Sequence, residues 1–163
     1  MKNKEQIVDI SFSSVPDVRI RVIEPSDAKA VIENKKKYPF ELHSSIDIKV
    51  LTTKREFEFT IFNGYTWNGA DIPRLFWRSI GSRTDNEFLI ASMLHDYLLE
   101  FKVYMLNQIL ENSISVKEYR RLTSLIFRHI LKEQGTNTIK ANIMSWAVQV
   151  FQMTINGRAW KNV

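Results

Sequence analysis

The chain has 163 residues, of which 44 % are hydrophobic and 25 % charged, a balance typical of a globular domain rather than of a disordered or fibrous chain. It contains no cysteine, which excludes disulfides, thiolate metal sites and cysteine nucleophiles. The formal net charge of +5 is too small to indicate a nucleic-acid-binding protein, whereas the aromatic share of 12 % is high.

The first 62 residues are predicted to be rich in β-structure, because apolar and polar side chains alternate there in short runs. Val18–Ile23 is one such run. Phe40–Thr52 and Glu56–Phe62 form the clearest pair, and the residues 53–55 between them have the right length for a hairpin loop. That loop lacks the glycine or asparagine that often marks a tight turn, so the hairpin is predicted from its strands.

Signals for the start and end of helices follow along the chain. Ser26 is predicted to be the N-cap of a short helix that ends near Lys37. The runs Thr84-Asp-Asn-Glu87 and Ser115-Val-Lys-Glu118 each have the spacing of a capping box, in which two side chains satisfy backbone amides of the first helical turn. The helix that begins at Ser115 is predicted to end at Gly135, because glycine accepts the left-handed backbone that often follows a helix.

A third long helix is predicted from about residue 138 to residue 155, and apolar side chains occupy two of its faces. Such a helix either lies inside the core or offers one face to a partner. Met144 and Phe151 on this helix, together with Trp160 in the tail, are therefore predicted to contact a partner.

Together these elements predict a single α+β domain over residues 1–163, with an N-terminal antiparallel β-sheet or hairpin, a rigid loop and a bundle of about three α-helices. The expected parts are a β-rich part at 1–62, a loop at 63–83, a helical part at 84–156 and a short tail at 157–163. No stretch approaches the roughly 20 apolar residues of a membrane span, and the first residues are too polar for the core of a signal peptide.

Residues 64–98 carry the most specific pattern in the chain. The loop Gly64-Tyr-Thr-Trp-Asn-Gly-Ala-Asp-Ile-Pro-Arg-Leu-Phe-Trp-Arg78 is followed by the run Leu94-His-Asp-Tyr-Leu98 on a predicted helix. A loop this rich in apolar side chains has to pack on the domain or cover something, so we expect it to be rigid. The residues assigned to this structural motif are Gly64, Asn68, Gly69, Pro73, Arg74, Trp77 and Tyr97.

His95 is the residue of this segment best suited to acid–base chemistry. It falls on the apolar stripe of its helix, where a buried histidine with satisfied ring nitrogens is one interpretation. The other interpretation pairs His95 with Asp71 or Asp96 as the catalytic residues of an enzyme. One histidine and two carboxylates are too few ligands to predict a metal site, and no cofactor-binding pattern accompanies them.

The two runs, in this order, resemble a family of small proteins of unknown function from tailed phages and prophages. That family shows a Gly-Phe-x-Thr-Asp-Gly-Ala-Ser-Ile-Pro-Arg loop, then a His-Asp-Tyr/Trp-Leu helix, then an Ala-Asp-Arg-x-Phe pattern. The resemblance spans roughly residues 40–150. It implies a phage protein, either a virion component of the tail or connector region or a small protein that binds a phage or host factor.

The chain departs from the family pattern at two acidic positions. The aspartate of the family loop is Asn68 here, and the aspartate of the later pattern is Ser124, whereas Asp71 stands where the loop has serine. These replacements reduce a potential acidic site and favour a protein that docks over an enzyme. An asparagine in a turn preserves the local bonds that an aspartate would make.

Three functions follow from this pattern. The favoured one is a non-enzymatic phage protein that docks on other virion proteins, on a host protein or on further copies of itself. The alternative is a hydrolase of a cell-wall or peptide bond that uses His95 with Asp71 or Asp96. Nucleic-acid binding has only the net charge and several arginines in its favour. The first function places the chain in the host cytoplasm during assembly and then in the virion, away from membranes.

Overall fold

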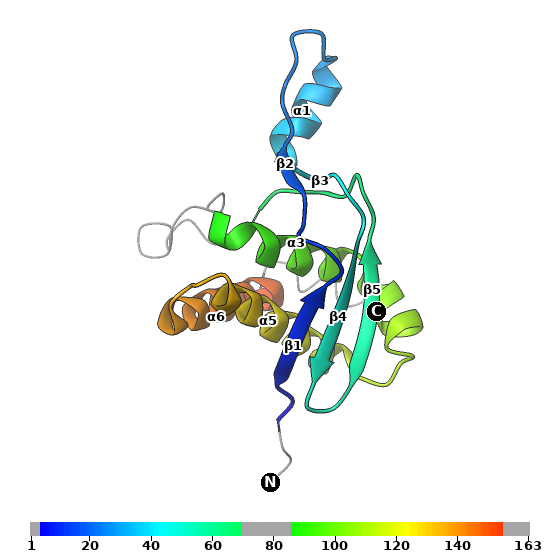
Figure 1. Ribbon diagram of the computed structural model, residues 1–163, viewed down its shortest axis with the longest axis vertical. Coiled ribbons are helices and arrows are strands. Elements are labelled where there is room, and N and C mark those ends of the chain that lie inside the picture. Colours follow the sequence, from blue (N-terminus) through cyan, green and yellow to red (C-terminus); the bar gives the residue numbers. More distant parts are fainter. Residues whose placement is uncertain (1–3, 70–85, 155–163) are drawn as a thin grey trace.

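The computed structural model describes residues 4–69 and 86–154, and Figure 1 shows how their helices and strands are arranged. Two three-stranded antiparallel sheets occupy the N-terminal part, and the long helices follow. This arrangement confirms the predicted α+β fold class. No helix in the two described ranges is long and apolar enough to cross a membrane.

The first sheet has the strand order β1-β4-β5 and supplies one side of the core. Its strands are β1 (Ile7–Phe12), β4 (Ile46–Thr52) and β5 (Glu56–Ile61). β4 and β5 form the predicted hairpin, with Ile48 opposite Phe59. Alternate side chains of both strands are buried, so one face of the hairpin packs inward and the other remains polar.

The loop of this hairpin is held by a threonine side chain. The hydroxyl of Thr52 accepts hydrogen bonds from the backbone amides of Lys54 at 3.1 Å and Arg55 at 2.9 Å. The same hydroxyl donates to the carboxylate of Glu5 at 2.8 Å, and the Arg55 side chain binds that carboxylate at 2.8 Å. These bonds explain how the turn closes without glycine or asparagine.

The second sheet has the order β2-β3-β6 and lies toward the upper end of the molecule in Figure 1. It consists of β2 (Val18–Ile20), β3 (Phe40–Leu42) and β6 (Thr66–Trp67), so β2 is shorter than the predicted run Val18–Ile23. Helix α1 (Lys29–Lys37) connects β2 to β3 and extends away from the rest of the protein, and none of its side chains is buried.

The predicted N-cap of α1 is wrong. The N-cap is Ala28, which makes no side-chain capping bond, and Ser26 lies in the turn before it. That turn is held by Asp27, whose carboxylate accepts hydrogen bonds from the ammonium of Lys35 at 2.7 Å and the backbone amide of Glu24 at 2.8 Å. These two bonds hold the pKa of Asp27 below its ordinary value. The carboxylate of Asp27 therefore organises the turn before α1, where Ser26 was expected to cap the helix.

Three long helices follow the sheets, as predicted. They are α3 (Asn86–Glu100), α5 (Val116–Glu133) and α6 (Thr138–Thr154). α5 packs between the other two and also contacts β1, so it lies at the centre of the helical part. One continuous cluster of buried side chains runs from the first sheet through α3 and α5 to α6.

The predicted ends of α5 are confirmed. The Ser115 hydroxyl accepts a hydrogen bond from the Glu118 amide at 3.2 Å, and the Glu118 carboxylate accepts one from the Ser115 amide at 2.9 Å. Gly135 follows the helix with a φ of +88°, a backbone conformation that few other residues adopt without strain. The other predicted capping box begins at Thr84, which lies outside the described residues.

The connection from α3 to α5 contains an irregular turn that the periodicity did not predict. A short helix, α4 (Lys102–Tyr104), leads into the π-helical turn η2 (Met105–Ile109), which packs beside β5. Glu111 and Asn112 then adopt left-handed conformations with φ of 48° and 57°. Phe101 lies between α3 and α4 and is partly exposed.

Candidate functional site

The histidine of the sequence motif lies in the packing between two helices. His95 is 4 % exposed, and its ring meets the ring of Phe127 on α5 in an edge contact, with 5.4 Å between the ring centres. Its Nδ1 atom lies 3.5 Å from an oxygen of Asp96, the next residue on α3. The structure therefore brings His95 and Asp96 together. The surroundings of His95 are those expected for the buried core histidine of the first interpretation.

Aromatic rings tie the described part of the motif loop to α3. The indole nitrogen of Trp67 donates a buried hydrogen bond to Ser92 at 3.2 Å. The ring of Tyr65 stacks on that of Trp67 and meets the edge of Tyr97, with ring centres 5.3 Å apart. Burial, followed by the negative charges of Asp96 and Glu100, raises the pKa of Tyr65 above its ordinary value, so its hydroxyl is neutral near pH 7.

Two glycines of the loop adopt backbone conformations that suit glycine. Gly64 has a φ of +82° and Gly69 a φ of +88°, and Asn68 lies directly before the second of them. The remaining predicted residues of this region lie outside the described residues, so a pairing of His95 with Asp71 stays a prediction. The predicted residues that the structure does not describe are Asp71, Pro73, Arg74, Trp77 and Trp160.

Ser124, which the resemblance aligned with an aspartate, lies in the contact between α5 and α6. Its buried hydroxyl donates to the carbonyl of Arg120 at 3.1 Å. Its own carbonyl accepts a hydrogen bond from the hydroxyl of Ser145 on α6 at 2.9 Å. This position therefore holds two helices together and offers no carboxylate for chemistry.

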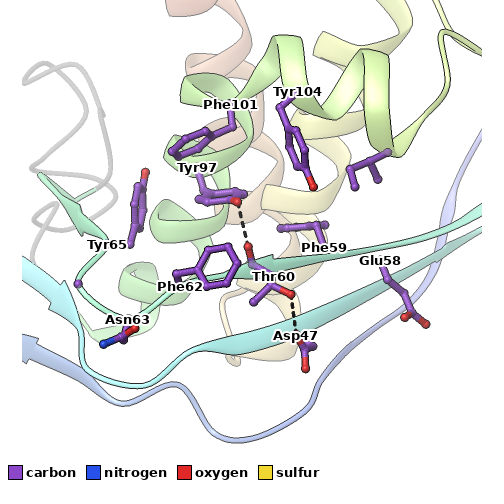
Figure 2. A pocket seen from close by; sticks show the side chains of 12 residues that line it. Asp47, Glu58, Phe59, Thr60, Phe62, Asn63, Tyr65, Tyr97, Phe101 and Tyr104 are labelled. Carbon is purple, nitrogen blue, oxygen red and sulfur yellow. Dashed lines mark hydrogen bonds between the residues drawn. The ribbon is translucent and has the colours of Figure 1, made fainter.

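A pocket of about 710 Å³ opens between β5 and the end of α3, and six of its twelve described lining residues are aromatic (Figure 2). Its buried part is formed by Phe59 and Tyr97, whose rings stack with their centres 5.7 Å apart. Phe62, Phe101 and Tyr104 stand around the opening and are exposed. The volume falls within the range of pockets that hold organic ligands or large side chains.

The charged side chains among the described residues that line the pocket are acidic. Asp47 and Glu58 contribute carboxylates, and none of the described residues that line the pocket is basic. Asp47 accepts a hydrogen bond from the hydroxyl of Thr60 at 2.7 Å, and the Thr60 carbonyl accepts one from the Tyr97 hydroxyl at 2.9 Å. Burial, with smaller effects of Tyr104 and Glu100, raises the pKa of Tyr97, so this hydroxyl remains a donor. We call this site the aromatic pocket.

The sequence contained one signal for this pocket that the prediction did not use. Phe57, Phe59 and Ile61 alternate on the buried face of β5, whereas Phe62 interrupts the alternation and is 67 % exposed. An aromatic residue in the register of the solvent face indicates a surface feature. The contributions of Asp47 and Tyr104 could not be inferred in this way, because they come from distant parts of the chain.

Helix α6 has two apolar faces, as predicted, and α5 covers one of them. Met144 belongs to the covered face and is fully buried, so the prediction that it contacts a partner does not fit this structure. The side chain of Phe151 falls outside the described part. The other face exposes a row of large side chains at helical spacing, which we call the α6 stripe: Ile139 (70 %), Ile143 (41 %) and Trp146 (57 %).

Metal-binding groups are sparse in the described ranges. No three His, Cys, Asp or Glu side chains of residues 4–69 and 86–154 lie close enough together to hold a metal ion. The His95–Asp96 pair alone offers too few ligands for a stable site.

The model of the family described as "Protein of unknown function (DUF1353)" matches residues 44–148. The chain belongs to this family. The DUF1353 match begins just before β4 and ends in α6, so it includes the hairpin, the aromatic pocket and the α6 stripe. It leaves out β1 and the segment of β2, α1 and β3.

The chain is also similar to the uncharacterized protein y4jT of Sinorhizobium fredii, with 29 % identity over 104 residues. The alignment covers 59 % of this chain but only 27 % of that protein. No solved structure matches the chain. Neither the description of the DUF1353 family nor the name of this relative states an activity.

Proposed function

We propose that this DUF1353 protein is a non-enzymatic phage protein that acts by docking on other proteins. The observation that carries docking is the α6 stripe, in which Ile139, Ile143 and Trp146 are exposed on a helix whose opposite face is already buried. The outer face of a helix on a globular domain normally carries polar side chains. A row of large apolar side chains there indicates a surface that another protein covers.

The assignment to a phage rests on the motif runs of residues 64–78 and 94–98, which resemble those of tailed-phage and prophage proteins. On this proposal the protein is a virion structural component of the tail or connector region. It is present in the host cytoplasm during assembly and afterwards in the particle. Its partners are other virion proteins or further copies of the chain.

The position of His95 gives less support to a hydrolase. A general base has to lie within about 3 Å of the proton that it removes, or reach it through one water molecule. The ring of His95 packs against Phe127 and is almost fully buried, and no histidine is among the described residues of the aromatic pocket. A hydrolase that uses His95 with Asp71 or Asp96 remains the alternative prediction.

The docking proposal is tested by the content of purified phage particles. The protein should be present at a fixed number of copies per particle, as measured by quantitative mass spectrometry. Trp146→Ser should lower that number by about tenfold or more, because tryptophan is enriched among the few interface residues whose truncation costs about 2 kcal/mol or more. Val15→Ser removes a side chain that is 87 % exposed elsewhere on the surface and should leave the number unchanged.

Two results would reject this proposal. One is the absence of the protein from particles of a phage that expresses it. The other is an equal loss of incorporation for Trp146→Ser and Val15→Ser, which would show that the α6 stripe has no special role.

A further inference from the structure

The second surface of interest lies on α5 and α6 and is opposite in charge to the aromatic pocket. A groove of about 260 Å³ runs between the two helices beside Trp146 of the α6 stripe. Arg121 and Arg128 line this groove from α5, and none of its described lining residues is acidic. Asn142 accepts a hydrogen bond from Arg128 at 3.3 Å, which holds that guanidinium near the helix contact. We call this surface, with the α6 stripe, the α5–α6 face.

The aromatic pocket has the complementary composition. Phe62, Phe101 and Tyr104 are exposed at its opening, and Asp47 and Glu58 supply negative charge. The ammonium group that approaches Glu58 is bound more closely by another carboxylate. Lys49 lies 3.6 Å from Glu58 but 2.5 Å from Glu56. Glu58 is therefore available to a cationic group that approaches from outside.

The two surfaces are formed by different parts of the chain. Figure 1 shows α6 beside α5 and below the start of α3, whereas β5, which forms one wall of the aromatic pocket, lies to the right of α5. The pocket and the α5–α6 face share no lining residue, so each can be occupied independently of the other. A second copy can present its α5–α6 face to the pocket of the first.

We propose that the protein assembles head to tail, with Trp146 of one copy inserted into the aromatic pocket of the next copy. This inference rests on the proposed docking function and names the partner as a second copy of this chain. Trp146 would enter among aromatic rings, which attract one another in stacked and edge-to-face arrangements. Arg121 and Arg128 would then approach the carboxylates of the pocket.

A contact of this kind has a definite consequence for the assembly. Each copy uses two different surfaces, so every added copy leaves one pocket and one α5–α6 face unfilled. The assembly ends only when a ring closes, and otherwise grows as a filament. The attraction between the arginines of one copy and the carboxylates of the next acts at the solvent-exposed edge of the contact. Salt screens such attraction, so association should weaken as the salt concentration rises.

The inference is tested by sedimentation of the full chain over a range of protein concentrations. The wild-type protein should form species larger than a dimer. A face variant, Trp146→Ser with Arg128→Gln, and a pocket variant, Phe62→Ser with Glu58→Gln, should each remain monomeric. All four substituted side chains are exposed or at the surface, and circular dichroism should show that both variants keep the wild-type fold.

Mixing the two variants provides the sharper result. The face variant retains an intact pocket, and the pocket variant retains an intact α5–α6 face, so an equal mixture contains one complete interface. It should form a heterodimer and nothing larger. Val15→Ser, which changes an exposed apolar residue on neither surface, should assemble like the wild type. If the pocket variant does not fold, Tyr104→Ser replaces it, because that side chain is also exposed at the opening.

Three results would overturn the inference. They are a wild-type protein that stays monomeric at the highest concentration, a single variant that assembles like the wild type, and a mixture that forms no heterodimer although the wild type assembles. A monomeric wild type that is nevertheless incorporated into particles through Trp146 would reject self-assembly and leave the docking function supported. If the protein assembles head to tail in solution but is absent from particles, self-assembly is supported and the function as a virion component is rejected.

Discussion

The indole N–H of Trp67 donates a hydrogen bond to the hydroxyl of Ser92 across 3.2 Å, in a fully buried contact. Trp67 lies on β6 at the start of the motif loop, and Ser92 lies on α3 one turn before the His-Asp-Tyr run. The hydroxyl of Ser92 also donates to the carbonyl of Leu89 at 2.9 Å, which fixes its lone pairs toward the indole. This bond joins the two halves of the sequence motif.

Replacement of Ser92 by alanine should destabilise the protein by about 1–3 kcal/mol, because it leaves the buried indole N–H of Trp67 without this acceptor. Urea unfolding measures the change. In a Trp67→Phe background the donor is already gone, so Ser92→Ala should cost clearly less there. An equal cost in both backgrounds would show that the hydrogen bond is not the cause.

Replacement of His95 by alanine should lower the free energy of unfolding by about 2–4 kcal/mol, as expected for truncation of a buried ring packed on Phe127. His43→Ala is the matched control, because His43 is exposed and its loss should change stability by less than about 0.5 kcal/mol. A His95→Ala protein that keeps wild-type stability but loses a hydrolytic activity would instead support the hydrolase.

Tyr119 should make the protein lose stability at alkaline pH. Its hydroxyl donates a buried hydrogen bond to the Leu98 carbonyl at 2.6 Å, and burial raises its pKa well above the ordinary value. The folded state therefore favours the protonated tyrosine, and its stabilising contribution is complete below pH of about 10, the pKa of an unfolded tyrosine. Above that pH, stability should fall by roughly 1.4 kcal/mol per pH unit for this residue.

The variant Tyr119→Phe tests this assignment. This substitution should lower the free energy of unfolding by about 1 kcal/mol at neutral pH. It should also remove the part of the alkaline loss of stability that comes from Tyr119, as measured by urea unfolding between neutral pH and pH of about 11. Tyr104→Phe, which removes an exposed hydroxyl, should keep the alkaline loss. The assignment fails if the two variants respond to alkaline pH in the same way.

The two predicted serine caps should differ sharply in their effect on stability. Ser115→Ala should cost about 0.5–2 kcal/mol because it removes the capping bond to Glu118, whereas Ser26→Ala should change stability by less than about 0.5 kcal/mol. The bonds from the Ser115 amide and hydroxyl hold the pKa of Glu118 below its ordinary value. Their contribution is therefore present at neutral pH and is lost as the pH falls through that lowered pKa. Equal thermal unfolding of the two variants would contradict this.

Local signals predicted the elements of the fold that depend on neighbours in sequence. The alternation in β4 and β5, the capping box of Ser115 and the left-handed Gly135 were all readable because each is set within a few residues. The cap at Ser26 failed because Lys35, eight positions further along the chain, binds Asp27 and organises the turn instead. Residue preferences identify a side chain that can cap a helix, but they do not reveal a distant side chain that organises the same turn in its place.

The candidate site depended more on tertiary packing. The motif run identified His95 and Tyr97, but it did not indicate that one packs toward α5 and the other forms part of a pocket. Two apolar faces were evident on α6, yet whether Met144 or Ile143 becomes exposed is set by where α5 lies. The aromatic pocket joins Asp47 of one hairpin to Tyr104 of a later turn, and no local pattern connects them.

The turn after η2 provides a means of stabilising the scaffold. Glu111 holds a left-handed conformation at a φ of 48°, which costs an L-residue about 1–2 kcal/mol relative to its preferred regions. Glycine avoids this strain, although the greater freedom of the unfolded glycine chain offsets about 0.5–1 kcal/mol of the gain. Glu111→Gly should therefore raise the unfolding temperature by a small amount while leaving the aromatic pocket and the α6 stripe untouched. A chain strengthened in this way would tolerate the polar substitutions at Phe62 and Trp146, and would serve as a robust background for engineering either surface.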